Sequence, residues 1–199
     1  MKDPDFEQAR QYALKCLEQE LPVALTYHSM EHTRDDVVPA AERLAAIEGI
    51  EAEELILLRT AAWYHDIGFI EQYEDHESVS IRMVCEILPR FGYTEAHIQV
   101  ISDVIMATKL PQSPDTLLGK IMVDADMDSL GRDDFLAQSD RLRAELEAFG
   151  NVQTDEEWYR GQIDFLKAHS YITDSAKALC NAGKERNIEK LCKLLSEVQ

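Results

Sequence analysis

Hydrophobic residues recur along this chain at intervals of three and four, the spacing that gathers side chains on one face of an α-helix. In residues 6–21, for example, Phe6, Ala9, Ala13 and Leu17 follow this spacing. No segment shows the alternation of a half-buried strand, and no sequence repeat or low-complexity linker divides the chain. The pattern therefore predicts an all-α fold.

Capping and turn residues set the expected helix boundaries. Asp3 is expected to cap the first helix, with Pro4 at its first position. Thr154 and Glu157 form a capping box ahead of a later helix, and Gly183 is expected to break the last one. The expected helices cover residues 3–21, 29–47, 51–66, 75–91, 94–109, 116–130, 133–149, 154–169 and 173–198.

The apolar run LLRTAAWYHDIGF ends in a polar pair, His65 and Asp66, which we expect in the last turn of the helix over 51–66. Gly68 is expected to stop that helix. A charge at the end of a buried helix is costly unless something binds it. The pair therefore indicates a bound cation.

Two further candidate ligands lie on either side of this pair. His32 occurs in YHSMEHTRDDV, in the first turn of the helix over 29–47, whose Pro39 is expected to introduce a kink. Asp126 occurs in the apolar-flanked run KIMVDADMDSLG. Two imidazoles and two carboxylates from three segments suit Mn, Fe, Zn, Ni or Mg, with positions left for water. Such a set makes a hydrolytic site possible.

The order His, then His-Asp, then Asp resembles the signature of the HD-domain metal-dependent phosphohydrolases. The similarity extends to the words YHSMEHT, AAWYHDIGF, YEDHE and VDADMDSLG, and it covers most of residues 25–135. The resemblance implies an HD-domain helical bundle in which His32, His65, Asp66 and Asp126 bind one divalent metal (Mn, Fe, Ni, Co, Zn or Mg). It also implies hydrolysis of a phosphomonoester or phosphodiester by metal-activated water, with a nucleotide among the candidate substrates.

The resemblance also guides the choice among neighbouring residues. The family's invariant aspartate aligns with Asp126, so Asp124 is expected to support the ligands from behind or to stabilise its helix. Related enzymes with two metals use extra histidines between the His-Asp pair and the last aspartate, and this chain has only His76 and His97 there. We therefore expect one metal, Asp66 and His76 as catalytic residues, and Glu77 as a supporting group or an alternative proton donor.

Lys109 and His28 are the candidate substrate contacts. Lys109 ends the helix over 94–109 and could meet a phosphate, although a lysine there also suits the helix dipole. His28 lies four residues before His32, close enough on a helix to face the same way. Trp63, Tyr64, Trp158 and Phe165 are expected to fill the core, and the alternative for these residues is an aromatic wall for a nucleobase.

Length and composition narrow the class of protein. We expect a single domain over residues 1–199, with the metal-site core at about 25–135 and a C-terminal helical extension at about 132–199. The sequence of the extension contains no motif that indicates a chemical function. A net charge of −18 without a Lys/Arg cluster argues against nucleic acid and anionic membranes as partners. Scattered cysteines and the lack of an apolar run of spanning length favour a cytoplasmic protein.

Two alternatives to the hydrolase remain at this level. The first is a metal-containing module that binds a nucleotide for regulation without cleaving it. The second is a helical interaction protein without a metal, for which the order of the four residues would be a coincidence. The oligomeric state is left open.

Overall fold

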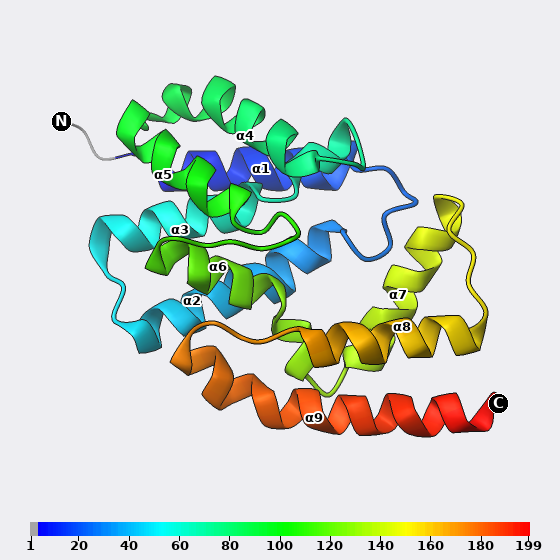
Figure 1. Cartoon of the computed structure of the whole chain (residues 1–199). Coiled ribbons are helices and arrows are strands. Elements are labelled where there is room, and N and C mark those ends of the chain that lie inside the picture. The colour runs from blue at the N-terminus through cyan, green and yellow to red at the C-terminus, as the bar shows by residue number, and fades with distance from the viewer. Residues whose placement is uncertain (1–3) are drawn as a thin grey trace.

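The computed structural model describes residues 4–199, and every regular element in that range is helical (Figure 1), as the hydrophobic pattern predicts. Four short turns interrupt or extend the helices: a π-helical turn, η1 (His32–Val37), and the 3₁₀ turns η2 (Ile67–Ile70), η3 (Leu88–Phe91) and η4 (Asp128–Gly131). The α-helices are α1 (Phe6–Glu20), α2 (Val38–Glu48), α3 (Ala52–Tyr64), α4 (His76–Ile87), α5 (Glu95–Met106), α6 (Leu117–Asp126), α7 (Phe135–Ala148), α8 (Asp155–Ala168) and α9 (Asp174–Glu197).

Helix α3 is the centre of the bundle. It packs against α1, α2, α5 and α6, and residues on all sides of it, such as Leu58, Ala61 and Tyr64, are fully buried. A helix that is apolar all round is stable only when neighbours cover every face. Helix α3 therefore lies inside the protein. His65 and Asp66, which follow its last residue, are buried as well.

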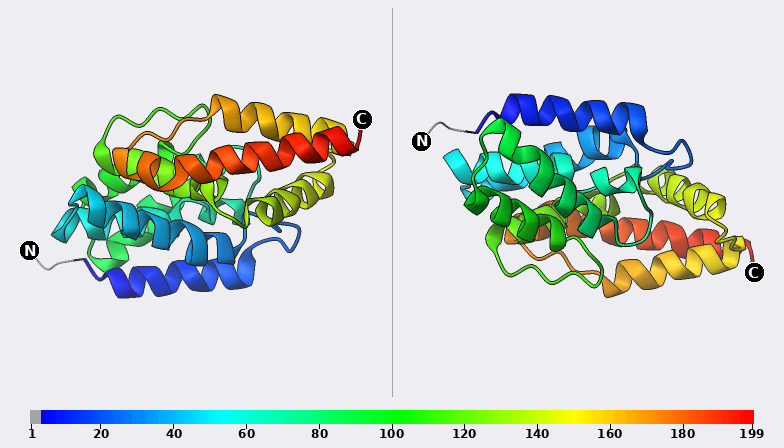
Figure 2. Two further views of the ribbon diagram at one scale, coloured as in Figure 1. Left: turned by 90° about the horizontal axis from the view of Figure 1, so that it is seen from below. Right: turned by 90° about the horizontal axis from the view of Figure 1, so that it is seen from above.

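The C-terminal helices form a second packed group. Helices α8 and α9 run side by side, and α1 lies on the opposite side of the molecule (Figure 2). Helix α9 also packs on η4 and α2, so the extension is joined to the bundle along its length.

The helix expected over 29–47 contains a wide turn. The Val38 N–H donates to Thr33 O, five residues back, which is the π-helical register. This irregularity lies in residues 32–37, one turn before the kink expected at Pro39. Such turns are frequent at functional sites because they displace side chains from the regular helical positions. Here the turn begins at His32.

Several expected boundaries were wrong by a turn or less. Helix α1 begins at Phe6 with Asp5 as its N-cap, and Asp3 lies outside the described residues. Helix α3 ends at Tyr64, so the His-Asp pair follows the helix instead of occupying its last turn. Gly68 lies within η2 and is needed for close packing, because a Cβ there would lie 2.0 Å from the His76 carbonyl oxygen.

Helix α9 is continuous, so the break expected at Gly183 was wrong. A Cβ on Gly183 would lie 1.7 Å from the Gly131 carbonyl oxygen, and the glycine therefore permits a close approach between α9 and η4. The capping box of Thr154 and Glu157 is present as expected. Trp63 and Trp158 are buried, whereas Phe165, also expected in the core, is 37% exposed.

Within residues 4–199 no helix has the length and apolar character that crossing a bilayer requires. The cysteines form no disulfide: Cys16 and Cys180 are buried thiols, and Cys85 and Cys192 are exposed.

Candidate metal centre

Three segments bring the four predicted ligands together. His32 opens η1, His65 and Asp66 follow α3, and Asp126 ends α6. The Nε2 atom of His32 lies 3.2 Å from Asp126 Oδ1 and 3.7 Å from Asp66 Oδ2. The Nε2 atom of His65 lies 3.2 Å from Asp66 Oδ2 and 3.6 Å from Asp126 Oδ1. Each imidazole thus faces both carboxylates.

One ligand atom from each of His32, His65 and Asp66 lies within 4.8 Å of the other two. Asp126 joins this set through its contacts with the two imidazoles, and its side chain is 17% exposed, against 5% for Asp66. The open side of the group is therefore the side of Asp126.

The tautomer of His65 is set by the backbone. Its Nδ1 atom lies 2.9 Å from the Ala62 carbonyl oxygen, which can only accept, so Nδ1 carries the proton. In the neutral ring, Nε2 then presents a lone pair to Asp66 and Asp126. Lone pairs and carboxylates directed at one point repel one another unless a cation or a proton lies between them.

Burial provides a test of whether these residues fit a metal. His65 Nε2 and Asp66 Oδ2 are buried and have no hydrogen-bond partner within the described chain. A buried polar atom without a partner costs free energy, and a divalent cation would satisfy both atoms at once. The two imidazoles and two carboxylates are also donors that first-row divalent metals accept. The donor set therefore fits a divalent cation.

Without a cation the same charges must be balanced by protons. Burial opposes protonation of His65, but the carboxylates of Asp66 and Asp126 outweigh it and raise the pKa of His65 well above its usual value. Burial likewise favours neutral carboxyls, yet the neighbouring imidazoles hold the pKa values of Asp66 and Asp126 below the usual range. A metal ion would compete with those protons for the same atoms.

His76, predicted as a proton donor, lies beside the cluster. Its Nε2 atom is 3.3 Å from Asp66 Oδ1, on the side of the carboxylate away from the unpartnered Oδ2. Its ring stacks on Phe69 with centroids 3.8 Å apart. Glu77 Oε2 lies 3.7 Å from His76 Nδ1. The structure thus places His76 next to Asp66 and Glu77 behind His76.

His28 is held by a buried carboxylate that the sequence analysis missed. Glu145, from α7, is fully buried. Its Oε1 atom lies 2.5 Å from His28 Nδ1 and accepts from the Tyr73 hydroxyl at 3.1 Å. Its Oε2 atom accepts from the backbone N–H groups of Tyr27 and His28 at 2.9 and 3.0 Å. The C-terminal extension therefore fixes the position of a residue next to the cluster.

The ion pair between Glu145 and His28 overcomes the effect of burial on both groups. Burial raises the pKa of Glu145, but His28 and the backbone donors lower it overall. Burial lowers the pKa of His28, but Glu145 and Asp66 raise it overall. In the sequence, Glu145 lies in the charged run RLRAELEA, where it resembles a surface residue, and no local signal marks it as buried.

Asp36 was also missed by the sequence analysis. Its Oδ2 atom lies 4.0 Å from His32 Nδ1, one turn along the same segment, and its other oxygen pairs with Arg132. A carboxylate behind a ligating imidazole is a common way to orient the ring in metal sites. The spacing of four residues from His32 is the signal that could have found it.

Asp124 faces away from the cluster. Its carboxylate accepts from Ile172 N at 2.8 Å and from both the backbone N–H and the hydroxyl of Thr173 at 2.7 Å. Thr173 is the N-cap of α9. The hydrogen bonds of the Asp124 carboxylate therefore go to the start of α9, and none of them goes to the four clustered residues.

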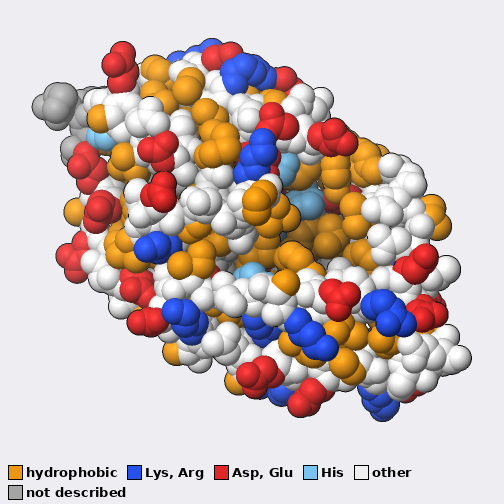
Figure 3. Space-filling view, in the orientation of Figure 1, with side chains coloured by type: hydrophobic (Ala, Val, Ile, Leu, Met, Phe, Trp, Pro, Cys, Tyr) orange, Lys and Arg blue, Asp and Glu red, His pale blue; other side chains and the backbone are white. Residues whose placement is uncertain are grey.

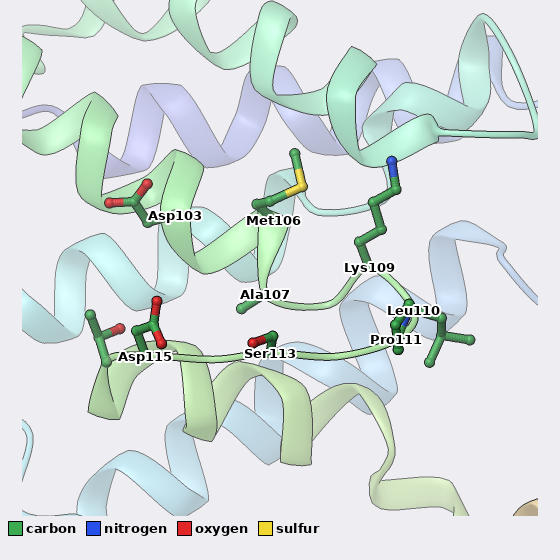
Figure 4. Close-up of a pocket in the computed structure, with 9 residues that line it drawn as sticks. Asp103, Met106, Ala107, Lys109, Leu110, Pro111, Ser113 and Asp115 are labelled. Carbon is green, nitrogen blue, oxygen red and sulfur yellow. The ribbon is translucent and has the colours of Figure 1, made fainter.

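Lys109, predicted to contact phosphate, points from the loop after α5 toward α4 (Figure 4). Its ammonium pairs with Asp75, the N-cap residue of α4 that precedes His76. The side chain is 42% exposed. Lys109 is therefore tied to the residue before His76, and a phosphate would have to compete with Asp75 for it.

The space-filling view shows a hollow in one face, lined by hydrophobic side chains, with histidine atoms visible inside it (Figure 3). The hollow agrees with a cavity whose walls include Tyr27 and His28 together with residues of α7 and α8. The ring of Tyr27 lies 5.0 Å from that of His32. The cluster and this cavity are thus separated by the thickness of about one side chain.

Comparison with known proteins identifies the fold. No family model matches the sequence, and no curated protein matches it. Among solved structures, a predicted HD superfamily hydrolase from an uncultured Thermotogales bacterium is similar, with 18% identity, a TM-score of 0.65 and coverage of 98% of this chain and 94% of that one. Bacillus subtilis YpgQ in complex with ADP is similar with 18% identity, a TM-score of 0.68 and coverage of 97% of both chains. The chain has the HD-domain fold, as its motif order led us to expect.

Proposed function

We propose that this protein is a metal-dependent phosphohydrolase whose divalent metal is bound by His32, His65, Asp66 and Asp126. The observation that carries the proposal is the pair of buried, unpartnered atoms, His65 Nε2 and Asp66 Oδ2, which face each other within a group of four metal-binding side chains. Two carboxylates and two imidazoles that converge in a buried site are costly for folding. A bound cation would offset that cost.

A divalent cation bound there supplies a Lewis acid that offsets phosphoryl charge and makes a nearby water more acidic. The protein residues do the rest. Asp66 links the cluster to His76 through its second oxygen, so that His76 can hold a proton for the leaving oxygen. His28, held by Glu145, has its ring 6.0 Å from that of His32 and is available to contact the substrate. Lys109 is available to a phosphate that displaces Asp75.

The substrate is a small phosphoester, either a monoester or a diester. Since the chain carries a net charge of −18, a phosphate enters this site favourably only if the metal reverses the local field. The similar structure of YpgQ contains ADP, which supports a nucleotide as the first substrate class to test.

The test is to strip the protein of metal with a chelator, return Mn, Mg, Fe, Co, Ni or Zn singly, and measure phosphate release from a panel of monoesters and diesters that includes nucleotides. We expect turnover to return with at least one metal and to be absent from His65→Ala under the same conditions. Metal-independent turnover, or turnover that survives His65→Ala, would overturn the proposal.

A second candidate is a metal-containing module that binds a nucleotide without hydrolysing it. The observation that favours it is that acidic residues already pair with basic side chains that could otherwise bind phosphate. Lys109 pairs with Asp75, and Arg132 pairs with Asp36. Metal uptake and nucleotide binding without phosphate release from any ester would select this candidate over the hydrolase.

A further inference from the structure

The cavity beside the metal cluster has features of a built binding site. It has a volume of about 310 Å³, which is near the lower end of the range for small-molecule pockets. Residues of η4, α7 and α8 supply most of its lining, and the apolar ones among them include Leu130, Leu142 and Phe165. Phe165 is a large aromatic residue left 37% exposed at this position.

Two glutamine side chains give the cavity polar groups of opposite kind. Gln138 Nε2 donates to Asp134 Oδ2 at 3.2 Å. A carboxylate can only accept, so the amide orientation is fixed and the Gln138 oxygen is left free to accept from a ligand. No other described residue donates to that oxygen.

A relay of hydrogen bonds contacts the amide of Gln162. The Trp158 indole N–H donates to Ser139 Oγ at 3.1 Å, and Ser139 Oγ in turn donates to Gln162 Oε1 at 3.3 Å. The Gln162 Nε2 group is therefore left without a partner in the described chain and is free to donate to a ligand. The cavity thus offers a ligand one hydrogen-bond acceptor, the oxygen of Gln138, and one donor group, the amide nitrogen of Gln162, among apolar walls.

These groups select among ligand classes. No lysine or arginine lines the cavity, so it does not suit a second phosphate or another anion. A purely aliphatic group would leave the free amide groups of Gln138 and Gln162 dehydrated and unpaired, which is unfavourable. A flat heteroaromatic ring with both donor and acceptor atoms on its edge satisfies the amides and stacks against the aromatic and apolar walls.

We propose that this cavity binds the nucleobase of a mononucleotide substrate, with Gln138 and Gln162 contacting the edge of the base. The position of the cavity agrees with this assignment, because Tyr27 and His28 form the wall between it and the metal cluster. A nucleotide whose phosphate lies at the cluster would place its base on the cavity side of Tyr27 and His28. This orientation rests on the proposed function, whereas the binding of the base does not.

The test measures binding separately from catalysis. Nucleosides and nucleoside 5′-monophosphates are titrated into the full-length, metal-free protein by calorimetry, with inorganic phosphate as a third probe. Leu142→Trp fills the cavity, and Gln162→Leu removes the donor. Gln11→Leu, on the exposed face of α1, is the matched control. We expect Leu142→Trp to weaken binding of at least one nucleoside or nucleotide by 10-fold or more and Gln162→Leu by about 3- to 10-fold, with the control unchanged.

The proposal is overturned if no nucleoside or nucleotide binds the wild-type protein at millimolar concentration, or if binding is unchanged in both Leu142→Trp and Gln162→Leu. Thermal melting establishes that each variant is folded, and Phe165→Ala, at a half-exposed position, replaces Leu142→Trp if that variant is not. Base binding that depends on the cavity without any phosphate release would refute only the hydrolase. Metal-dependent hydrolysis that is insensitive to these variants would refute only the nucleobase site.

Discussion

Buried carboxylates of this molecule lie in two kinds of surroundings, one in which protein donors fill their lone pairs and one in which an oxygen is left open. In the contact between α6 and the start of α9, Asp124 accepts three hydrogen bonds from Ile172 and Thr173. In α7, Glu145 accepts from two backbone N–H groups, an imidazole and a hydroxyl. In the metal cluster, Asp66 has one oxygen near His76 and the other unpartnered.

The difference separates structural carboxylates from those that await a ligand. A buried carboxylate whose lone pairs are filled by protein donors stabilises the fold, and removing it leaves those donors unpaired. A buried carboxylate with an open oxygen contributes less to the fold and more to binding. The contrast between Asp124 and Asp66 can therefore be tested by substitution. Replacing Asp124 should lower the free energy of unfolding, and replacing Asp66 should lower metal affinity.

The largest effect is expected from Asp66→Ala, which removes a proposed ligand. Metal affinity, measured by calorimetry with Mn or Zn on the stripped protein, should fall at least 1,000-fold, about 4 kcal/mol. Circular dichroism should report the same helix content as wild type. The matched control is Asp124→Asn, which should bind metal as wild type does; equal affinities for Asp66→Ala and wild type would refute the metal assignment.

The next largest effect concerns Glu145. Replacing it by Ala leaves His28 and two backbone N–H groups without their buried acceptor, so the free energy of unfolding should fall by about 3 kcal/mol. Glu145→Gln keeps an acceptor oxygen and should cost less. The exposed Glu147→Ala serves as the control, and urea denaturation provides the measurement. A loss no greater than that of Glu147→Ala would show that the buried carboxylate is not structural.

A smaller loss of stability is expected for Asp124→Asn. The amide retains one acceptor oxygen but must turn its N–H₂ group toward donors of Thr173 or Ile172, so about 2 kcal/mol of unfolding free energy should be lost. The substitution should leave metal affinity within 2-fold of wild type, again by calorimetry. If metal binding falls with stability intact, the contrast between the two carboxylates fails.

The smallest effect is expected in the pH dependence of the free energy of unfolding, through His169 in the C-terminal region. Burial, aided by the nearby Lys184 ammonium, lowers the pKa of His169 from 6.5 to about 4. Between these values the unfolded chain binds a proton that the folded chain does not, so stability falls as the pH drops from 6.5 to 4. We expect His169→Gln to reduce this loss by about 1 kcal/mol between pH 7 and 5 in urea titrations. Identical pH slopes for both proteins would contradict this expectation.

The sequence predicted the fold class because helical periodicity is a local signal. It predicted the four clustered residues through the resemblance of their order to the HD-domain signature, since His32 and Asp126 themselves lie 94 residues apart. Helical periodicity is repeated along the chain, and the motif residues lie at the ends of apolar runs. The position of Asp124 could not be predicted, because it depends on Thr173, which is 49 residues away and in a separate helix. Glu145 was missed for the same reason, since its partner His28 is 117 residues distant.

Glycine roles were misjudged for a related reason. Gly68 and Gly183 were interpreted as helix stops, the local role that a glycine most often suggests. Both instead allow a close approach to backbone distant in sequence, that of α4 and of η4. Such a requirement has no local signature, so it becomes visible only when the packing is known.

Phe69 lies against two of the histidines discussed above, with its ring stacked 4.5 Å from that of His28 and 3.8 Å from that of His76. The ring current of a phenyl group moves the resonances of protons held over its faces to lower frequency. The imidazole C–H signals of His28 and His76 should therefore be displaced from those of a free, solvent-exposed imidazole in a proton NMR spectrum. The contacts of this one ring therefore give the site two built-in spectroscopic reporters.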